Sequence, residues 1–205
     1  MAINRKFFFE QVRATLFTGR LSQGQVSGLT FALDVWEKAH KDKDDRWLAY
    51  ALATAYHETA FTMQPIHERG GNEYFRKNCD VTGRNPTRAR RMENTRPGDG
   101  ALFHGRGYVQ LTWRVNYRKM GDAFGSDLTS SAAAADRVLN AELAAKIMFK
   151  GMEGGVFTGV GFRKFFNGTI EDWFNARKII NGTDCADGIR SYAKKFYAAI
   201  SYTTA

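Results

Sequence analysis

The sequence predicts a predominantly helical α+β protein, and three observations support that prediction. Apolar residues recur with helical spacing early and late in the chain, and no alternating run typical of a strand exceeds a few residues. Between residues 61 and 107, glycine and proline crowd short β-prone pieces, which indicates a small antiparallel sheet with long loops. We therefore expect two helical lobes around a loop-rich middle, with the sheet beside an active-site cleft between the lobes.

Three helices are expected before the middle of the chain. Residues 7–17 have the apolar spacing of the first. Ser22 and Gln25 stand three residues apart and form a capping box at the start of the second. The third is expected to begin at a cap formed by Asp44 or Asp45.

Helical spacing returns in the second half of the chain. Asn167 and Asp184 are of the residue types that cap helices, and we expect them as caps there. Neither an internal repeat nor a linker rich in serine or proline interrupts the chain, so residues 1–205 are expected to form one domain. The expected helices cover residues 111–120, 132–152, 170–180 and 186–202.

Composition limits the possible functions. Of the 205 residues, 43% are hydrophobic and 25% are charged, which excludes intrinsic disorder. No apolar stretch approaches the roughly 20 residues that span a bilayer, and the apolar run at residues 7–9 ends at Glu10, so neither a membrane anchor nor a secretory leader is expected. Cys79 and Cys185 are expected to be free thiols in a reducing cytosol.

The chain is strongly basic, with a net charge of +9. Such a charge favours approach to a polyanion, whether nucleic acid, anionic lipid or acidic cell-wall polymer. Residues 84–96 contain five arginines and one glutamate. We expect a helix with a basic face there, which serves either as a solvated surface or as an adhesion surface for an anionic polymer.

Glu58 has the sequence features of a general acid. Helical steps of about 100° per residue bring Trp47, Ala51 and Glu58 to within about 20° of the same face, so this carboxyl prolongs an apolar stripe. It is also expected near the helix C-terminus, where the macrodipole opposes a negative charge. Both effects raise the pKa of a carboxyl group, and a carboxyl that stays protonated near neutral pH can protonate a leaving alcohol.

Glu68 has the opposite surroundings. It lies next to Arg69 in a polar, glycine-rich segment, where solvent and the arginine keep a carboxylate ionised. Two carboxyls with separated pKa values are the working pair of glycoside hydrolysis, one as the acid and one as the base that activates water. From the residues alone a second interpretation stays open, because most glutamates at helix ends and in loops are solvated charges.

Other catalytic chemistries have weaker support. His57 and Glu58 begin an H-E-x-x-H zinc motif, but Phe61 occupies the place of the second histidine. The remaining histidines and cysteines match no zinc spacing, so no metal is expected, and His57 is expected to donate a hydrogen bond. There is no G-x-S-x-G elbow. The glycines of residues 105–110 lack the Lys-Ser or Lys-Thr ending of a phosphate loop, so no cofactor is expected.

Three short segments stand out in chain order. They read His-Glu-Thr-Ala at residues 57–60, Gly-Arg-Gly-Tyr-Val-Gln-Leu-Thr at 105–112 and Ile-Ile-Asn-Gly at 179–182. Together they resemble the chitinases of glycoside hydrolase family 19. The chain looks closer still to phage endolysins, which resemble the chitinase core with several loops removed. Their sequences are similar to this one at residues 94–100 and 103–107. The resemblance covers residues 47–192 and implies a lysozyme-like fold.

The resemblance implies roles for individual residues. Glu58 matches the general acid and Glu68 the base, with Glu73 as the alternative base because that loop varies in length. Thr112 matches the residue that helps to hold the attacking water. Substrate contacts are expected from His57, Tyr108, Gln110, Asn116 and Asn181.

Two positions depart from the family pattern. Val115 stands where the family has a tyrosine, and Tyr108 stands where it has a proline. Sugar contacts are therefore expected to differ. Tyr108 and Trp113 have two interpretations, as a floor for a sugar ring or as core aromatics.

The expected function is hydrolysis of the β-1,4 glycosidic bonds of peptidoglycan by an inverting mechanism, for which the carboxyl groups stand about 6.5–9.5 Å apart. The resemblance implies a monomeric endolysin without a cofactor or a separate wall-binding module. Such an enzyme is made in the host cytoplasm and reaches the periplasm with the help of a holin, without binding nucleic acid or inserting stably into a membrane. The alternatives are a chitinase, a nucleic-acid-binding protein favoured by the charge, and an inactive wall-binding relative.

Overall fold

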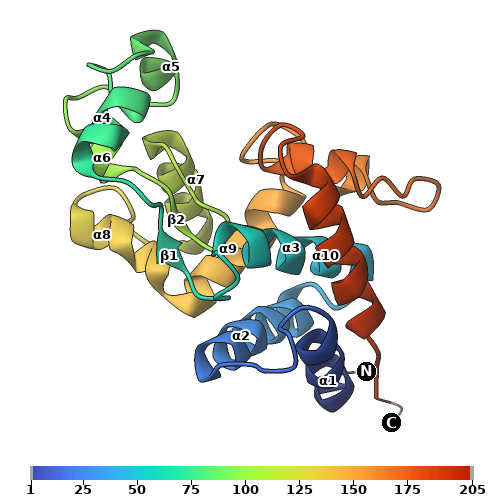
Figure 1. Ribbon diagram of the computed structural model, residues 1–205. Coiled ribbons are helices and arrows are strands. Elements are labelled where there is room, and N and C mark those ends of the chain that lie inside the picture. Colours follow the sequence, from blue (N-terminus) through green and yellow to red (C-terminus); the bar gives the residue numbers. More distant parts are fainter. Residues whose placement is uncertain (1, 204–205) are drawn as a thin grey trace. The chain divides into compact units, whose positions relative to one another are not determined.

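The computed structural model describes residues 2–203, and helices dominate them (Figure 1). Within that range the sheet is one antiparallel pair of short strands, so the predicted α+β, predominantly helical class is confirmed. The chain divides into two compact units, one combining the chain up to Gln64 with the chain from Ala145 onward, the other spanning Pro65–Ala144. Both ends of the chain therefore contribute to one unit, and the middle of the chain forms the other.

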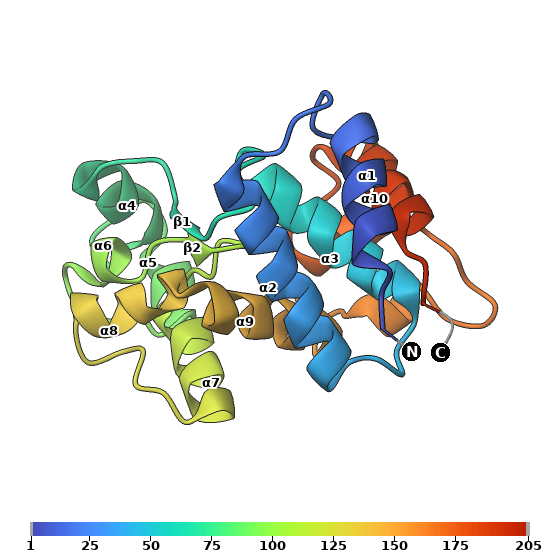
Figure 2. The same ribbon diagram turned by 90° about the horizontal axis from the view of Figure 1, so that it is seen from below.

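The first unit is built around its third helix. It contains α1 (Arg5–Thr15), α2 (Gln23–Ala39), α3 (Asp45–Glu58), most of α9 (Ala141–Glu153), α10 (Ala186–Ala199) and the 3₁₀ turns η2 (Phe162–Lys164) and η3 (Asn175–Ile179). Every residue of α3 from 47 to 56 is buried, as expected of a helix that is apolar on all sides. α10 packs against α3 and α1, and α2 also contacts α3 (Figures 1 and 2).

Local capping residues place the first three helices close to their predicted positions. The Ser22 hydroxyl accepts a hydrogen bond from the Gln25 backbone, and the Gln25 side chain accepts one from the Ser22 backbone, so the predicted capping box is confirmed. Asp44 caps α3 by accepting from the backbone N–H of Arg46. α1 begins two residues before its predicted start because Asn4 caps it.

The later helices depart further from the prediction. Residues 170–180 form only the short turn η3. Asn167 is not a helix cap, because its side chain closes a turn by accepting two backbone N–H groups, and Asp184 does not cap α10, which has no side-chain cap. The predicted helix over residues 132–152 is interrupted before α9, at the position where Asn140 accepts from the first turn of that helix.

The second unit contains the sheet and several short helices. Its elements are β1 (Ile66–His67), α4 (Asn72–Cys79), α5 (Pro86–Arg91), α6 (Asp99–Leu102), β2 (Arg106–Gly107), α7 (Arg114–Phe124), α8 (Ala132–Asp136), the 3₁₀ turn η1 (Arg137–Leu139) and the start of α9. In the sheet, Ile66 lies opposite Gly107 and His67 opposite Arg106. The predicted antiparallel sheet is confirmed, but the predicted long loops contain the helices α4 and α6.

Asp80 organises the segment that was predicted to be loop. Its side chain is buried, and its carboxylate accepts from the backbone N–H groups of Gly98 at 2.8 Å and Gly100 at 3.0 Å. Burial opposes ionisation of Asp80, but hydrogen bonds from these N–H groups and from Thr82 outweigh it and hold its pKa below the usual range. A carboxylate fixed in this way ties α4 to α6.

The remaining expectations concern the basic segment and the cysteines. The helix predicted within residues 84–96 is confirmed as α5, and the arginines of that segment are exposed. Cys79 and Cys185 are both free. Within the described range, no helix is both long enough and apolar enough to cross a bilayer.

Candidate active site

The two predicted catalytic carboxylates belong to different units and are described in turn. Glu58 is the last residue of α3. Its Oε1 accepts a hydrogen bond of 2.7 Å from Arg177 Nη1, and the two side chains are 17% and 4% exposed. The prediction of apolar surroundings for Glu58 is therefore wrong, because the buried guanidinium of Arg177 contacts its carboxylate.

Arg177 lies in η3 and is itself held in place. Its Nε donates to the carbonyl of Asp184 at 3.1 Å, and its own carbonyl accepts from the backbone N–H of Asn181 at 3.0 Å. A charge-assisted hydrogen bond from such a fixed guanidinium sets the orientation of the carboxylate. Arg177 was not predicted from the sequence, although it stands about one helical turn before Asn181.

Two predicted substrate-binding residues accompany this ion pair. Asn181 is exposed just after η3, and His57 is half-buried in the last turn of α3. Each lies within four residues of one member of the Glu58–Arg177 pair. Both side chains reach solvent.

Glu68 follows β1 in the second unit. Its Oε2 accepts from the backbone N–H of Gly105 at 3.0 Å, and its own N–H donates to the carbonyl of Gly105 at 2.7 Å. Gly105 directly precedes β2, so the pairing of the strands places the two residues side by side. A Cβ at position 105 would lie 2.9 Å from Glu68 Oε2 and would displace the end of that side chain.

Gln110, Thr112 and Asn116 continue from Glu68 in a chain of contacts. Gln110 Oε1 is buried and has no hydrogen-bond partner among the described residues, and it lies 2.8 Å from the position of a Cβ on Gly105. The Thr112 hydroxyl donates to the Gln110 carbonyl at 2.9 Å, and Asn116 Nδ2 donates to the Thr112 carbonyl at 2.9 Å. The structure thus brings Glu68 and Gln110 to the same glycine, and Thr112 bonds to the backbone of Gln110.

Arg106 makes the Gly-Arg-Gly segment rigid. Its side chain is 3% exposed and forms an ion pair of 2.7 Å with Asp136. Its Nη1 also donates to the carbonyls of Leu102 and His104 and to the hydroxyl of Tyr117. These bonds satisfy the buried guanidinium and backbone carbonyls that would otherwise lack donors. The sequence singled out this segment without indicating that role.

Three candidate substrate-binding side chains, Tyr108, Trp113 and Asn116, are buried inside the protein. Tyr108 is 1% exposed and Trp113 is 8% exposed, so neither ring presents a face to a sugar and the core interpretation describes both. Asn116 is 4% exposed and its amide bonds to a backbone carbonyl, so the structure gives it a bracing role instead of a substrate contact. Glu73, the alternative base, is exposed in the first turn of α4.

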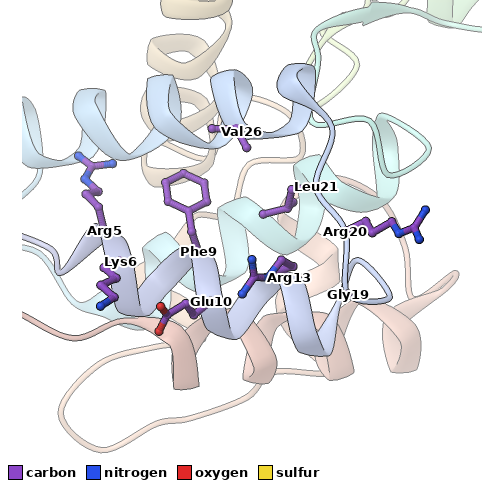
Figure 3. Close-up of a pocket in the computed structure, with 9 residues that line it drawn as sticks. All are labelled: Arg5, Lys6, Phe9, Glu10, Arg13, Gly19, Arg20, Leu21 and Val26. Atoms are coloured by element: carbon purple, nitrogen blue, oxygen red, sulfur yellow. The ribbon is translucent and has the colours of Figure 1, made fainter.

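A hollow of about 710 Å³ lies beside α1 in the first unit (Figure 3). Its apolar lining includes Phe9, Leu21 and Val26, and no candidate catalytic residue lines it. Among residues 2–203, no group of three or more histidines, cysteines or acidic residues is arranged to hold a metal ion.

The fold resembles that of the family 19 chitinases. No family model and no curated protein matches the sequence, but solved structures match the fold. Chitinase C from Streptomyces griseus has a TM-score of 0.62 and 21% identity, covering 96% of this chain and 75% of its own. A glutamate-to-glutamine mutant of chitinase C has a TM-score of 0.58 and 22% identity over 98% and 94% of the two chains. A bacterial family 19 chitinase has a TM-score of 0.54 and 20% identity over 97% and 95%.

Proposed function

We propose that this protein is a glycoside hydrolase that cleaves β-1,4 glycosidic bonds by an inverting mechanism. The observation that carries the proposal is a pair of anchored carboxylates within a chitinase fold. Arg177 holds Glu58, and the backbone of Gly105 holds Glu68. Anchoring supports a catalytic role because reaction requires the reacting groups to keep their positions closely.

In the proposed reaction, Glu58 protonates the glycosidic oxygen as its bond to the anomeric carbon breaks. Glu68 accepts a proton from the water that attacks the anomeric carbon from the opposite face, so the configuration inverts. The carbonyl oxygen of the Gln110 side chain approaches Gly105 as Glu68 does, and the Thr112 hydroxyl bonds to the Gln110 backbone; both groups are of types that can orient that water. Arg177 neutralises the carboxylate that Glu58 becomes after it has given up its proton.

We propose peptidoglycan as the substrate. The net charge of +9 and the exposed arginines of residues 84–96 support a polymer that carries negative charge. Chitin is the second candidate, favoured by the chitinases whose fold this chain shares. Chitin is uncharged, so the basic surface would have no partner on it.

The proposed biological role is that of a phage endolysin. It is supported by the resemblance of residues 94–100 and 103–107 to endolysins of that kind. In this role the monomeric enzyme is made in the host cytoplasm and acts on the cell wall from the periplasm, after a holin has opened the inner membrane. The exposed arginines of residues 84–96 then favour adhesion to an anionic wall polymer, an attraction that salt weakens.

The substrate proposal predicts that the enzyme cleaves murein faster than chitin, and an assay of the reducing ends released measures this preference. Purified murein and soluble chitin are incubated with equal amounts of enzyme, and we expect at least about ten times more reducing ends from murein, equivalent to about 1.4 kcal/mol in transition-state binding. Cleavage of chitin alone would overturn the substrate and keep the hydrolase. An enzyme that releases reducing ends from neither polymer would overturn the hydrolase itself.

Gly105→Ala is expected to lower kcat on murein by about tenfold or more, because small displacements of a reacting group have large effects on rate. The added Cβ would lie 2.9 Å from Glu68 Oε2 and 2.8 Å from Gln110 Oε1, so both side chains must move. Gly71→Ala is the matched control, since a Cβ there meets no atom within 4 Å. Equal kcat values for the two variants would show that the position of Glu68 does not govern the rate.

A further inference from the structure

Two histidines lie immediately before the residues that hold the proposed base. His67 precedes Glu68, and His104 precedes Gly105. His67 Nδ1 and His104 Nε2 are 3.0 Å apart, and the two rings stack with centroids 5.3 Å apart. The histidine contact and the two Glu68–Gly105 hydrogen bonds are therefore neighbouring links between the same two chain segments.

The direction of the histidine hydrogen bond follows from a third group. His104 Nδ1 lies 2.6 Å from the carbonyl oxygen of Ala101. A carbonyl can only accept, so His104 Nδ1 carries the proton in that bond. In neutral His104 the other nitrogen, Nε2, is then an acceptor, and His67 Nδ1 must donate to it. The ring of His104 also stacks on Phe75 of α4 with centroids 4.4 Å apart, which fixes its plane.

We propose that His67 and His104 are positioning residues for Glu68, and that the hydrogen bond from His67 Nδ1 to His104 Nε2 keeps β1 and the chain before β2 in the register that places the Glu68 carboxylate. This inference rests on the proposed function, in which Glu68 activates the attacking water. It adds two side chains that neither touch the substrate nor exchange a proton with it.

The inferred hydrogen bond depends on pH through His104. A second proton on His104 turns Nε2 into a donor that faces the donor on His67, and the bond is lost. Burial lowers the pKa of His104, the N–H donated to Ala101 raises it, and the positive charge of Arg106 lowers it further.

The other charged neighbours act more weakly. The electrostatic interaction with His67 also lowers the pKa of His104, and that with Asp136 of α8 raises it. Glu68 and Arg69 are the next charged residues after His67, and Cys79 of α4 interacts with Glu68. Because the net effect is a lowered pKa, His104 Nε2 remains an acceptor at neutral pH, and the hydrogen bond is lost as the pH falls through the pKa of His104. Folding stability declines in the same direction, since the unfolded chain binds that proton more readily.

The test uses substitutions that remove or keep the hydrogen bond. His67→Phe and His104→Phe are each expected to lower kcat on murein about tenfold, with KM and the melting temperature close to wild type. The phenylalanine at position 104 keeps the stacking on Phe75. The double variant is expected to lose no more than either single variant, because both remove the same bond. His67→Gln keeps a donor and is expected to retain most of the wild-type kcat.

The pH dependence of kcat distinguishes a positioning role from a merely structural one, because a merely structural role would leave it unchanged. Wild-type kcat is expected to fall on the acid side with an inflection at the pKa of His104 measured by NMR, and His104→Phe is expected to lack that inflection. His40→Gln is the matched control, because burial also lowers the pKa of His40, at the end of α2, and its profile should equal that of the wild type. Wild-type kcat in both phenylalanine variants, or losses that multiply in the double variant, would overturn the inference.

NMR separates failure of this inference from failure of the proposed function. In the wild type, the nitrogen shifts of His104 are expected to report a protonated Nδ1 and a hydrogen-bonded Nε2, and His67→Phe is expected to shift the Nε2 signal alone. A free Nε2 in the wild type would overturn the histidine bond, whether or not the protein cleaves murein. An intact bond in a protein that cleaves neither polymer would overturn the proposed function and with it the positioning role.

Discussion

Glu58→Gln is expected to lower kcat on murein by at least about a hundredfold, the lower end of what a positioned general acid contributes. The glutamine oxygen can still accept the hydrogen bond from Arg177, so the side chain keeps its place. It has no acidic proton to give to the glycosidic oxygen, so bond cleavage loses its acid. The rate at which reducing ends appear from murein, compared with that of the wild type, measures the effect.

The same substitution is expected to weaken the fold, because Arg177 is 4% exposed and loses its counter-charge. Removing the carboxylate charge that faces a buried guanidinium costs about 2 kcal/mol, which lowers the melting temperature by about 5 °C in a protein of this size. Kinetics are therefore measured well below that temperature. Glu171→Gln is the matched control, since the Glu171 side chain is 56% exposed and neither kcat nor stability should change. A folded Glu58→Gln protein with wild-type kcat contradicts the acid assignment.

Those parts of the fold that short-range chemistry determines were predictable from the sequence. Ser22 and Gln25 form their capping box within a single turn, and Asp44 caps α3 across two residues, so local sequence suffices for both. The short helices α4 and α6 were expected as loop because their order depends on Asp80, whose carboxylate reaches Gly98 and Gly100 some 20 residues away. Contacts at such a separation leave no periodic pattern in the chain.

In the candidate site, too, local features were predictable from the sequence and contacts between distant residues were not. Glu58 was singled out as the candidate acid because its helix position and its resemblance to a motif are both local properties. Its partner Arg177 is 119 residues away, and nothing in the sequence around Arg177 indicates that its side chain is buried. The bond between His67 and His104 spans 37 residues and appears only when the two strands pair. Tyr108 was ambiguous because an aromatic residue suits a core and a sugar site equally, and only its burial decides.

Glu68→Gln is expected to remove catalysis while leaving the fold intact. The glutamine oxygen can accept the N–H of Gly105 as the carboxylate does, so the melting temperature should stay within about 2 °C of wild type. The amide cannot take a proton from water, and kcat on murein should fall at least about a hundredfold. Kinetics and thermal unfolding of the same preparation measure both quantities.

Glu73→Gln is both the matched control for Glu68→Gln and the test of the competing assignment. Glu73 is exposed in the first turn of α4, where its charge contributes under about 1 kcal/mol through the helix dipole, so this variant should keep wild-type kcat. Azide sharpens the comparison, because it attacks the anomeric carbon without having to lose a proton. Added azide should restore turnover in Glu68→Gln with a glycosyl azide of inverted configuration as product, and should not restore it in Glu58→Gln, which still lacks the acid. Loss of kcat in Glu73→Gln, with azide rescue there and none in Glu68→Gln, would make Glu73 the base.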